Sequence, residues 1–345
     1  MRNIEGAGLG AGHYAVPARA DSGRVEVTTG STSRGDDMAL QVMTVRGPVS
    51  PDELGHTQTH DHVFSDISWA RHRWVAMPNT DEVQMTEEVG FYKDAGGGTL
   101  VECTLEHIGR MPEAMQRISE TTGVHIVMGT GFYREPYYPE FVNKWTTRRL
   151  AEYMVDEIEN GWADTGIRPG IIGEIGIDKR WVQGVEERVI RAAARAHHAS
   201  GLAITTHTPP HTALLFHEIL LEEEVPPDRI IYGHLDNTLE MDELERVAQT
   251  GAYIQFDLIG IEWINVDVRR ARFLAELIRR GHRDRLLVAQ DMPARPRLMT
   301  NGGHGYRHLI DSFLPMLRNE GVDEETIHHI THTNPARVLA VDSAD

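Results

Sequence analysis

From residue 39 onward, the hydrophobic pattern alternates between short apolar runs and longer amphipathic stretches. Eight runs rich in Val and Ile each end in a polar residue. The first ends near residues 60–62, and the others cover residues 99–104, 126–131, 170–174, 203–207, 230–234, 253–257 and 286–291. Amphipathic patterns typical of helices lie between several of them, over residues 110–122, 147–162, 185–200, 242–250 and 268–280. Apolar strands that alternate with helices predict a parallel sheet covered by helices.

The number of repeated units decides between the two common folds of this kind. Eight strand–helix units in roughly 250 residues match the size of a (β/α)8 TIM barrel. A doubly wound sheet is the alternative, but nothing in that fold requires eight units. We therefore predict a single α/β barrel domain over residues 39–345. A helix pair over residues 324–339 closes it, and Asn334 and Pro335 begin a helix there.

Residues 1–38 break this pattern. The segment is rich in Gly, Ser and Arg and has little to bury, so we expect a flexible N-terminal extension. It contains no apolar region of a secretory signal, and no run in the chain approaches the length of a bilayer-spanning helix. Cys103 is the only cysteine, which excludes an intrachain disulfide. Together these features favour a cytoplasmic location.

The charge balance narrows the classes of partner. The chain has 52 acidic and 34 basic residues, a net charge of -18, and no basic stripe. Nucleic acid and anionic membrane surfaces are therefore poor partners, and a small-molecule substrate is the expectation.

Polar side chains stand at the carboxyl ends of the predicted strands. The residues are His60, His62, Glu174, His207, His234 and Asp291. In a barrel these ends converge on one mouth, where neutral imidazoles and carboxylates together form a metal site. Taken one at a time, each has a structural alternative: Asp291, for example, could cap a helix. Their placement at the ends of different strands favours two ions, about 3.5–4 Å apart as in two-metal hydrolytic sites.

Two further residues are candidates for contacts at the mouth. Tyr133 follows the third strand and could hydrogen-bond a substrate oxygen, although a tyrosine packed against the barrel fits as well. Asp257 ends the seventh strand and could contact substrate, orient a metal ligand or cap the next segment.

These residues, in this order, resemble the phosphotriesterase family of the amidohydrolase superfamily. Residues 45–62, 123–127 and 334–337 carry the general resemblance. The closer likeness to the phosphotriesterase-related branch rests on residues 96–102, 170–176, 256–260 and 297–306.

The resemblance implies a barrel with two divalent metal ions of the zinc type, commonly in a homodimer. By resemblance, His60, His62 and Asp291 would hold one ion, and His207 and His234 the other. Glu174 stands where the family often has a bridging carboxylated lysine, as in the related branch.

Three departures from the family bear on the substrate. Asp61 stands between the two histidines where glutamate is usual. Leu258 follows Asp257 where many phosphotriesterases carry a histidine, and the arginine of lactonase members is missing nearby. His211, four residues after His207, is a candidate substrate contact peculiar to this chain.

We therefore predict hydrolysis of a carboxylic ester, lactone or amide by a metal-bridged hydroxide. Glu174 bridges the ions, and Asp291 transfers the proton from the nucleophile to the leaving group. Phosphotriester cleavage is expected as a side activity. The alternatives are a phosphotriester hydrolase, or a metal-holding barrel that binds a small ligand and hydrolyses nothing.

Overall fold

The structure of this chain is a computed structural model that describes residues 39–68, 78–292 and 294–343. The predicted extension over residues 1–38 lies outside the described residues, so its flexibility stays a prediction. Across the described parts of the chain, every helix is too short or too polar to cross a lipid bilayer.

The centre of the fold is a sheet of eight strands, in the order β10-β9-β8-β7-β6-β5-β4-β3. Each neighbouring pair is parallel. The strands are β3 (His56–Asp61), β4 (Gly97–Glu102), β5 (His125–Thr130), β6 (Ile171–Gly176), β7 (Ile204–His207), β8 (Ile230–Tyr232), β9 (Tyr253–Phe256) and β10 (Leu286–Val288). Because β10 also packs beside β3, the sheet curls back on itself and the predicted (β/α)8 barrel is confirmed.

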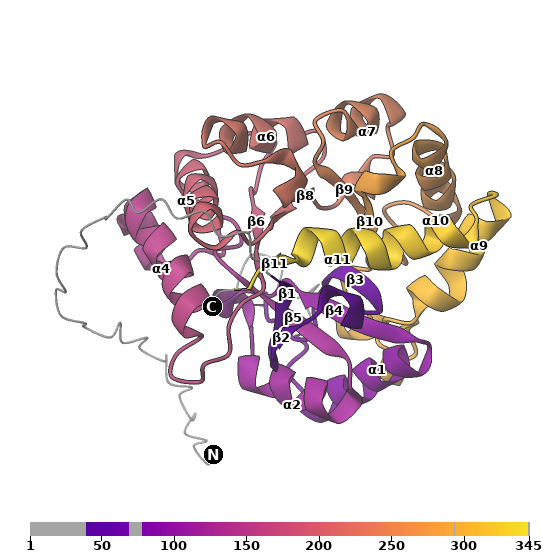
Figure 1. The fold of residues 1–345 in the computed structure, drawn as a ribbon, viewed down its shortest axis with the longest axis horizontal. Coiled ribbons are helices and arrows are strands. Elements are labelled where there is room, and N and C mark those ends of the chain that lie inside the picture. Colours follow the sequence, from indigo (N-terminus) through magenta and orange to yellow (C-terminus); the bar gives the residue numbers. More distant parts are fainter. Residues whose placement is uncertain (1–38, 69–77, 293, 344–345) are drawn as a thin grey trace, which may run out of the picture. The chain divides into compact units, whose positions relative to one another are not determined.

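Helices surround the strands on the outside of the barrel (Figure 1). They are α1 (Glu82–Asp94), α2 (Pro112–Thr122), α3 (Glu140–Lys144), α4 (Thr147–Asn160), α5 (Gly184–Ser200), α6 (Ala213–Glu222), α7 (Met241–Ala248), α8 (Asp267–Arg279), α9 (Leu314–Asn319), α10 (Glu324–His328) and α11 (Asn334–Leu339). Each of the five predicted amphipathic stretches is a helix, and α11 begins at Asn334 as expected. Helices α1 and α6 were not predicted from the pattern.

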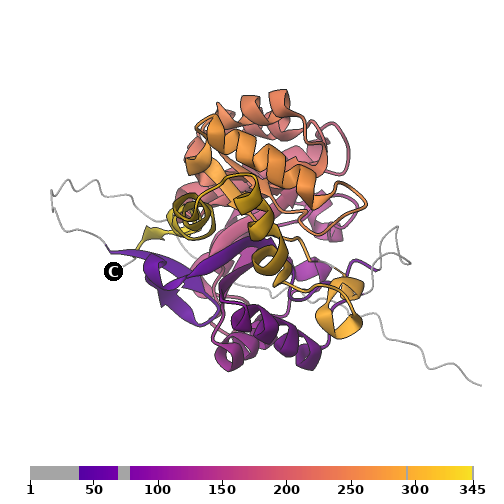
Figure 2. The same cartoon turned by 90° about the vertical axis from the view of Figure 1, so that its right-hand side faces the viewer.

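The amino-terminal end of the barrel is closed by a small sheet and the last helix. Strands β1 (Leu40–Thr44), β2 (Gly47–Val49) and β11 (Val341–Asp342) form this sheet in the order β11-β1-β2. In Figure 2 the β1–β2 hairpin and α11 lie together on one side of the barrel. Val42 and Leu339 belong to one apolar cluster with Val101 and Leu287 from the barrel strands. This plug leaves the opposite end, at the carboxyl ends of the strands, as the mouth.

Several polar side chains within the barrel are paired with one another. All six residues of β3 are buried. The Thr59 hydroxyl, for example, donates to Gln255 Oε1 across the barrel over 2.7 Å. Buried polar groups require such partners, so the barrel can carry histidines and carboxylates to its mouth without a large desolvation penalty.

Candidate metal centre

The six strand-end residues predicted as metal ligands lie together at the mouth of the barrel. His60 is in β3 and His62 follows it, so both imidazoles project to the same side, as an extended chain requires. Glu174 comes from β6 and His207 from β7. His234 and Asp291 follow β8 and β10. The structure therefore brings side chains from five strands into one cluster.

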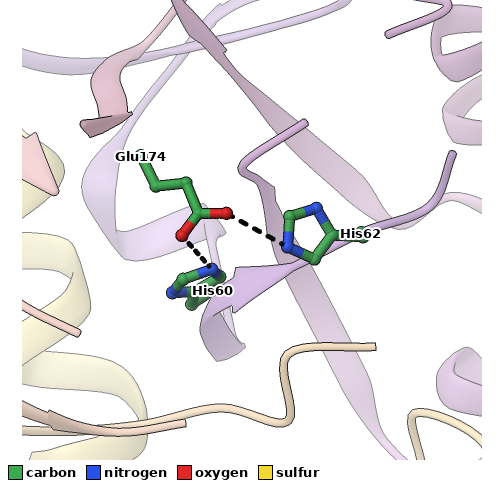
Figure 3. A group of neighbouring side chains, drawn as sticks. All are labelled: His60, His62 and Glu174. Atoms are coloured by element: carbon green, nitrogen blue, oxygen red, sulfur yellow. Dashed lines mark ion pairs between the residues drawn. The ribbon is translucent and has the colours of Figure 1, made fainter. Parts of the chain in front are cut away.

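The Glu174 carboxylate lies at the centre of this cluster. One oxygen, Oε2, is 3.4 Å from His60 Nε2 and 3.2 Å from His207 Nδ1. The other oxygen, Oε1, is 3.6 Å from His62 Nε2. Figure 3 shows the carboxylate between the imidazoles of His60 and His62, with one oxygen directed to each. A carboxylate whose two oxygens face different imidazoles can serve as a bridging ligand.

The remaining contacts define overlapping groups of donor atoms, one of which joins His60 and His234 with Asp257. His62 Nε2 is 3.0 Å from Asp291 Oδ1, and His234 Nε2 is 2.8 Å from His207 Nδ1. The donor atoms of His60, His62 and Glu174 all lie within 4.8 Å of one another, and so do those of Glu174, His207 and His234. Glu174 is common to the last two groups.

A buried carboxylate behind the imidazoles fixes how two of them point. Asp257 has no exposed side-chain surface, and its oxygens are 2.9 Å from His60 Nδ1 and 2.8 Å from His234 Nδ1. Gln255 donates to the same carboxylate over 2.8 Å. Occupation of each Nδ1 leaves each Nε2 to face Glu174, which is how carboxylates orient metal-binding histidines in proteins.

His62 is oriented by a hydroxyl instead. Its Nδ1 is 2.8 Å from Thr104 Oγ1, at the end of β4, and the Thr104 hydroxyl donates to the Phe64 carbonyl oxygen. Because the hydroxyl proton is used there, the imidazole Nδ1–H donates to Thr104, and Nε2 is left to face Glu174 and Asp291.

Two of the candidate ligands have a strained backbone. His234 has φ 59° and Asp291 has φ 44°, in the left-handed region that non-glycine residues rarely adopt. The His234 N–H donates to Asp257 Oδ1 over 2.8 Å, which stabilises this conformation. Such backbone strain costs about 1–3 kcal/mol per residue and gathers at functional sites.

With this geometry in place, comparison with known proteins identifies the family. The profile described as the Phosphotriesterase family matches residues 40–339. This chain belongs to the phosphotriesterase family.

Relatives within the family carry several activities. The chain is 31% identical over 341 residues to the human N-acetyltaurine hydrolase, an alignment that covers 87% of this chain and 97% of that protein. It is 33% identical over 290 residues to the phosphotriesterase homology protein of Escherichia coli strain K12, covering 84% and 99%. A lactonase from Listeria monocytogenes shares the fold with a TM-score of 0.83 at 28% identity, covering 87% and 98%. The family is one of hydrolases with a binuclear metal centre.

The donor set of this phosphotriesterase-family chain fits divalent cations. His60 Nε2 is buried and has no hydrogen-bond partner among the described residues, although it faces Glu174. A buried imidazole nitrogen without a donor or acceptor is costly unless another atom occupies its lone pair. Imidazole nitrogens with carboxylate oxygens are the ligands that zinc-like ions prefer.

The electrostatics of the cluster also favour bound cations. Burial lowers the pKa of His234, but the negative charge of Asp257 outweighs burial and raises that pKa to about 10. Burial raises the pKa of Glu174, but the positive charge of His60 and hydrogen bonds from His207 and His234 hold it well below its usual value. The buried carboxylates thus draw positive charge into the cluster, and metal cations can supply that charge in place of protons.

The three predicted substrate contacts have different positions. The Tyr133 hydroxyl is 3.3 Å from His207 Nδ1, so it lies at the edge of the cluster. Asp257 lies behind the imidazoles, and its two oxygens contact His60 and His234. It therefore orients these two side chains and has no exposed surface for a substrate. His211 is exposed and turned away, with its Nδ1 2.8 Å from Glu243.

Several residues around the centre were not predicted from sequence. Gln255 lies two positions before Asp257, so the alternation of a strand could have placed both on one side. Thr104 stands at the end of the second barrel strand, where polar residues were already of interest. Arg134 follows Tyr133 directly and lies at the same mouth, but a lone arginine in a loop carries no sequence signal.

Proposed function

We propose that this chain is a metal-dependent hydrolase of carboxylic-acid derivatives that acts at the strand-end cluster. One observation carries the proposal: the Glu174 carboxylate lies within 3.2–3.7 Å of four imidazoles, with Oε1 toward His62 and Oε2 toward the other three. In this proposal His60, His62 and Asp291 would hold one divalent ion and His207 and His234 the other, with Glu174 as a ligand common to both. The donor set favours zinc.

The bound ions would lower the pKa of water toward neutrality and polarise the scissile carbonyl oxygen. The chain's own residues supply the proton transfer. Asp291 accepts the proton that water loses as its oxygen attacks the acyl carbon, and it returns that proton to the departing nitrogen or oxygen. The products are a carboxylic acid and an amine or alcohol, so atoms and charge balance.

The protonation state of Asp291 suits this role. Burial raises the pKa of Asp291, but the hydrogen bond with His62 and the positive charges of neighbouring histidines outweigh it and lower the pKa. An ionised carboxylate at neutral pH can accept a proton, and general acid–base catalysis of this kind contributes about 10²–10⁴-fold. Tyr133, at the edge of the cluster, would orient the substrate by its hydroxyl.

Among acyl bonds we place the amide first. The similarity to N-acetyltaurine hydrolase over most of both chains supports cleavage of a short N-acyl group from an amino compound. The similarity to a lactonase supports lactone or ester cleavage as the second candidate. Phosphotriester cleavage is proposed only as a side activity, because Leu258 replaces the histidine expected after Asp257.

A panel of substrates on metal-loaded protein tests the proposal. The panel would contain N-acetylated amino compounds, aryl acetates, five-membered lactones and an aryl phosphotriester, with metal content measured on the same sample. Two ions per chain and chelator-sensitive turnover of an amide, ester or lactone is the expected result. Two ions with turnover of the phosphotriester alone would favour the alternative hydrolase. No turnover of any compound would favour a barrel that only binds ligand.

A further inference from the structure

Arg134 stands beside the proposed centre without being one of its ligands. Arg134 lies just past the end of β5, in the loop that also carries Tyr133. Gly176, at the end of β6, donates its N–H to the Tyr133 carbonyl oxygen over 2.5 Å. A β-carbon placed on Gly176 would lie 2.9 Å from the β-carbon of His207 and 3.2 Å from that of Arg134. Arg134 and His207 therefore both lie against the same glycine.

The Arg134 guanidinium is held in place by three neighbours. Its Nη1 donates to Asp178 Oδ1 over 2.5 Å, and its side chain is 20% exposed. Its Cζ lies 5.1 Å from the centroid of the Tyr133 ring and 5.2 Å from that of Tyr137. Because a guanidinium that packs on aromatic rings and pairs with a carboxylate is already immobilised, it loses little further conformational entropy when it binds an anion.

The same guanidinium retains donor capacity. Arginine has five N–H donors, of which the pair with Asp178 uses one on Nη1 and a hydrogen bond with the Tyr133 side chain uses another. Its Nε is buried without a hydrogen-bond partner within the described residues, so the donors left for a substrate are on the terminal nitrogens. A partly buried arginine with spare donors can bind a carboxylate or sulfonate by charge-assisted hydrogen bonds.

The negative charge of the chain makes a cation near the mouth important for an anionic substrate. The chain carries a net charge of -18, and the proposed centre itself contains Glu174, Asp257 and Asp291. Two divalent ions would offset these carboxylates, but the rest of the chain remains acidic, so an anionic substrate gains from a local cation near the mouth.

We propose that Arg134 recognises an anionic end of the substrate and selects N-acyl amino compounds whose amine portion carries a carboxylate or sulfonate. This inference rests on the proposed amide hydrolysis and names its substrate class. The acyl group faces the centre, and the anionic end lies toward the loop after β5. Arg134 acts on substrate binding and transfers no proton.

The test compares anionic and neutral substrates of equal length on full-length, metal-loaded protein. N-acetyltaurine and N-acetyl-β-alanine are the anionic substrates, one sulfonate and one carboxylate, and N-acetylethanolamine is the neutral one. We expect the wild type to prefer at least one anionic substrate by about 10-fold or more in kcat/KM. Arg134→Gln should lower kcat/KM for that substrate about 10- to 100-fold, mainly through KM, and leave the neutral substrate nearly unchanged.

Two further variants separate recognition from structure. Arg134→Lys keeps the charge and should retain part of the preference, while the lost fork geometry raises KM. Arg191→Gln is the matched control, because Arg191 also pairs with glutamates, on the outer helices, and its loss should not alter selectivity. If Arg134→Gln does not fold, ethanesulfonate and propionate serve as competitive inhibitors of neutral-substrate turnover by the wild type, with propionamide as the uncharged control.

The outcomes distinguish this inference from the proposed function. Turnover of the neutral amide without a preference for either anion, or a preference that survives Arg134→Gln, would overturn the role of Arg134 and leave the hydrolase standing. Anions that inhibit no better than propionamide would overturn it as well. Absence of turnover on every amide would instead remove the amide hydrolysis on which the inference rests. The preferred anionic compound identifies sulfonate or carboxylate as the natural group.

Discussion

The backbone N–H of Asp291 donates to the carbonyl oxygen of His60 over 3.1 Å. This hydrogen bond joins the segment after β10 to β3. The contact that closes the barrel therefore also places the proposed metal ligand Asp291 beside the proposed metal ligand His60. Arg297 secures the same point, because its guanidinium donates to the carbonyl oxygens of Asp291, Gln290 and Ile259. The same hydrogen bonds therefore close the barrel and position Asp291 at the centre.

Asp291→Asn tests the proton-transfer role. The amide keeps the shape of the carboxylate but cannot accept the proton from water, so kcat should fall about 10²–10⁴-fold. Metal content should stay near that of the wild type, because four imidazoles and Glu174 remain. Kinetics on metal-loaded protein and elemental analysis of the same sample give both values.

A matched variant controls for the loss of a carboxylate as such. Asp311 pairs with Arg307 on the surface, and Asp311→Asn should leave kcat unchanged. Wild-type turnover by Asp291→Asn would remove Asp291 from proton transfer.

Asp257→Asn tests the orientation of the imidazoles. An asparagine side chain has one oxygen acceptor, so it cannot accept from both His60 and His234, which Asp257 contacts at 2.9 and 2.8 Å. Loss of such a partner typically weakens metal binding about 10–100-fold. Competition with a chromophoric chelator would measure the change in affinity. If KM rose at saturating metal while affinity stayed the same, Asp257 would act on substrate instead.

Much of this architecture could be predicted from the sequence because its signals are local. The strands are short, apolar and regularly spaced, and each candidate ligand stands at the end of one. Helix α1 was missed because Glu88 lies on its buried face, where it accepts from the Met299 and Thr300 N–H groups and breaks the apolar stripe. Helix α6 was missed for the opposite reason: its sequence, ALLFHEILLE, is apolar nearly all round and shows no clear face.

The details of the site depended on contacts that sequence spacing does not carry. The direction of the Asp257 side chain follows from two histidines, one of which lies about two hundred positions away in the chain. His211 looked equivalent to its neighbour His207, but its backbone φ of 65° and its pairing with Glu243 turn it outward. Arg134 matters only because the barrel brings its loop next to Gly176.

Removal of metal should destabilise the folded chain. Without metal cations, only protonated imidazoles can balance the negative charge of the buried carboxylates. His60 Nε2 then also stays without a partner within the described residues. A ligand at one hundred times its Kd stabilises the folded state by about 2.7 kcal/mol per site. We expect a chelator to lower both the midpoint of urea unfolding and the turnover, and zinc to restore both. An unchanged midpoint after complete removal would contradict a metal centre built into the fold.

Acid should destabilise the protein through His56, which lies away from the proposed centre. Burial, with the nearby His332, lowers the pKa of His56 from 6.5 to about 3. Its Nδ1 donates to the Tyr92 hydroxyl over 3.0 Å, and that hydroxyl donates to the His56 carbonyl oxygen. The unfolded chain therefore takes up a proton below its pKa of 6.5 that the folded chain does not bind until near 3. Stability contributed by neutral His56 is lost as pH falls through this range.

His56→Asn isolates this effect, because an asparagine N–H can replace Nδ1 and does not titrate. Between pH 7 and pH 5 the free energy of unfolding of the wild type should fall by about 2 kcal/mol more than that of His56→Asn. Urea unfolding at the two pH values measures the difference. Equal losses in both proteins would show that His56 is not responsible.

Gly176→Ala should disturb the centre without removing any functional group. Its new β-carbon would lie 2.9 Å from the His207 β-carbon and 3.0 Å from the Tyr133 carbonyl oxygen, distances that force one of them to move. Because both are anchored at strand ends, the shift displaces His207 relative to Glu174. Displacements of this size can lower turnover about 100-fold. Neutral substrates should lose turnover as well as anionic ones, in contrast to Arg134→Gln.

Gly184→Ala provides the control for replacement of a glycine close to the same loop. Gly184 begins α5, and a β-carbon there would meet nothing within 4 Å. Alanine at this helical position should leave turnover unchanged and raise the free energy of unfolding by up to about 1 kcal/mol. Steady-state kinetics and urea unfolding of the two variants, measured side by side, therefore separate a steric effect at the centre from a general effect of added side-chain bulk. Equal turnover of Gly176→Ala and the wild type would show that the added β-carbon is accommodated without displacing His207, and the predicted disturbance of the centre would be wrong.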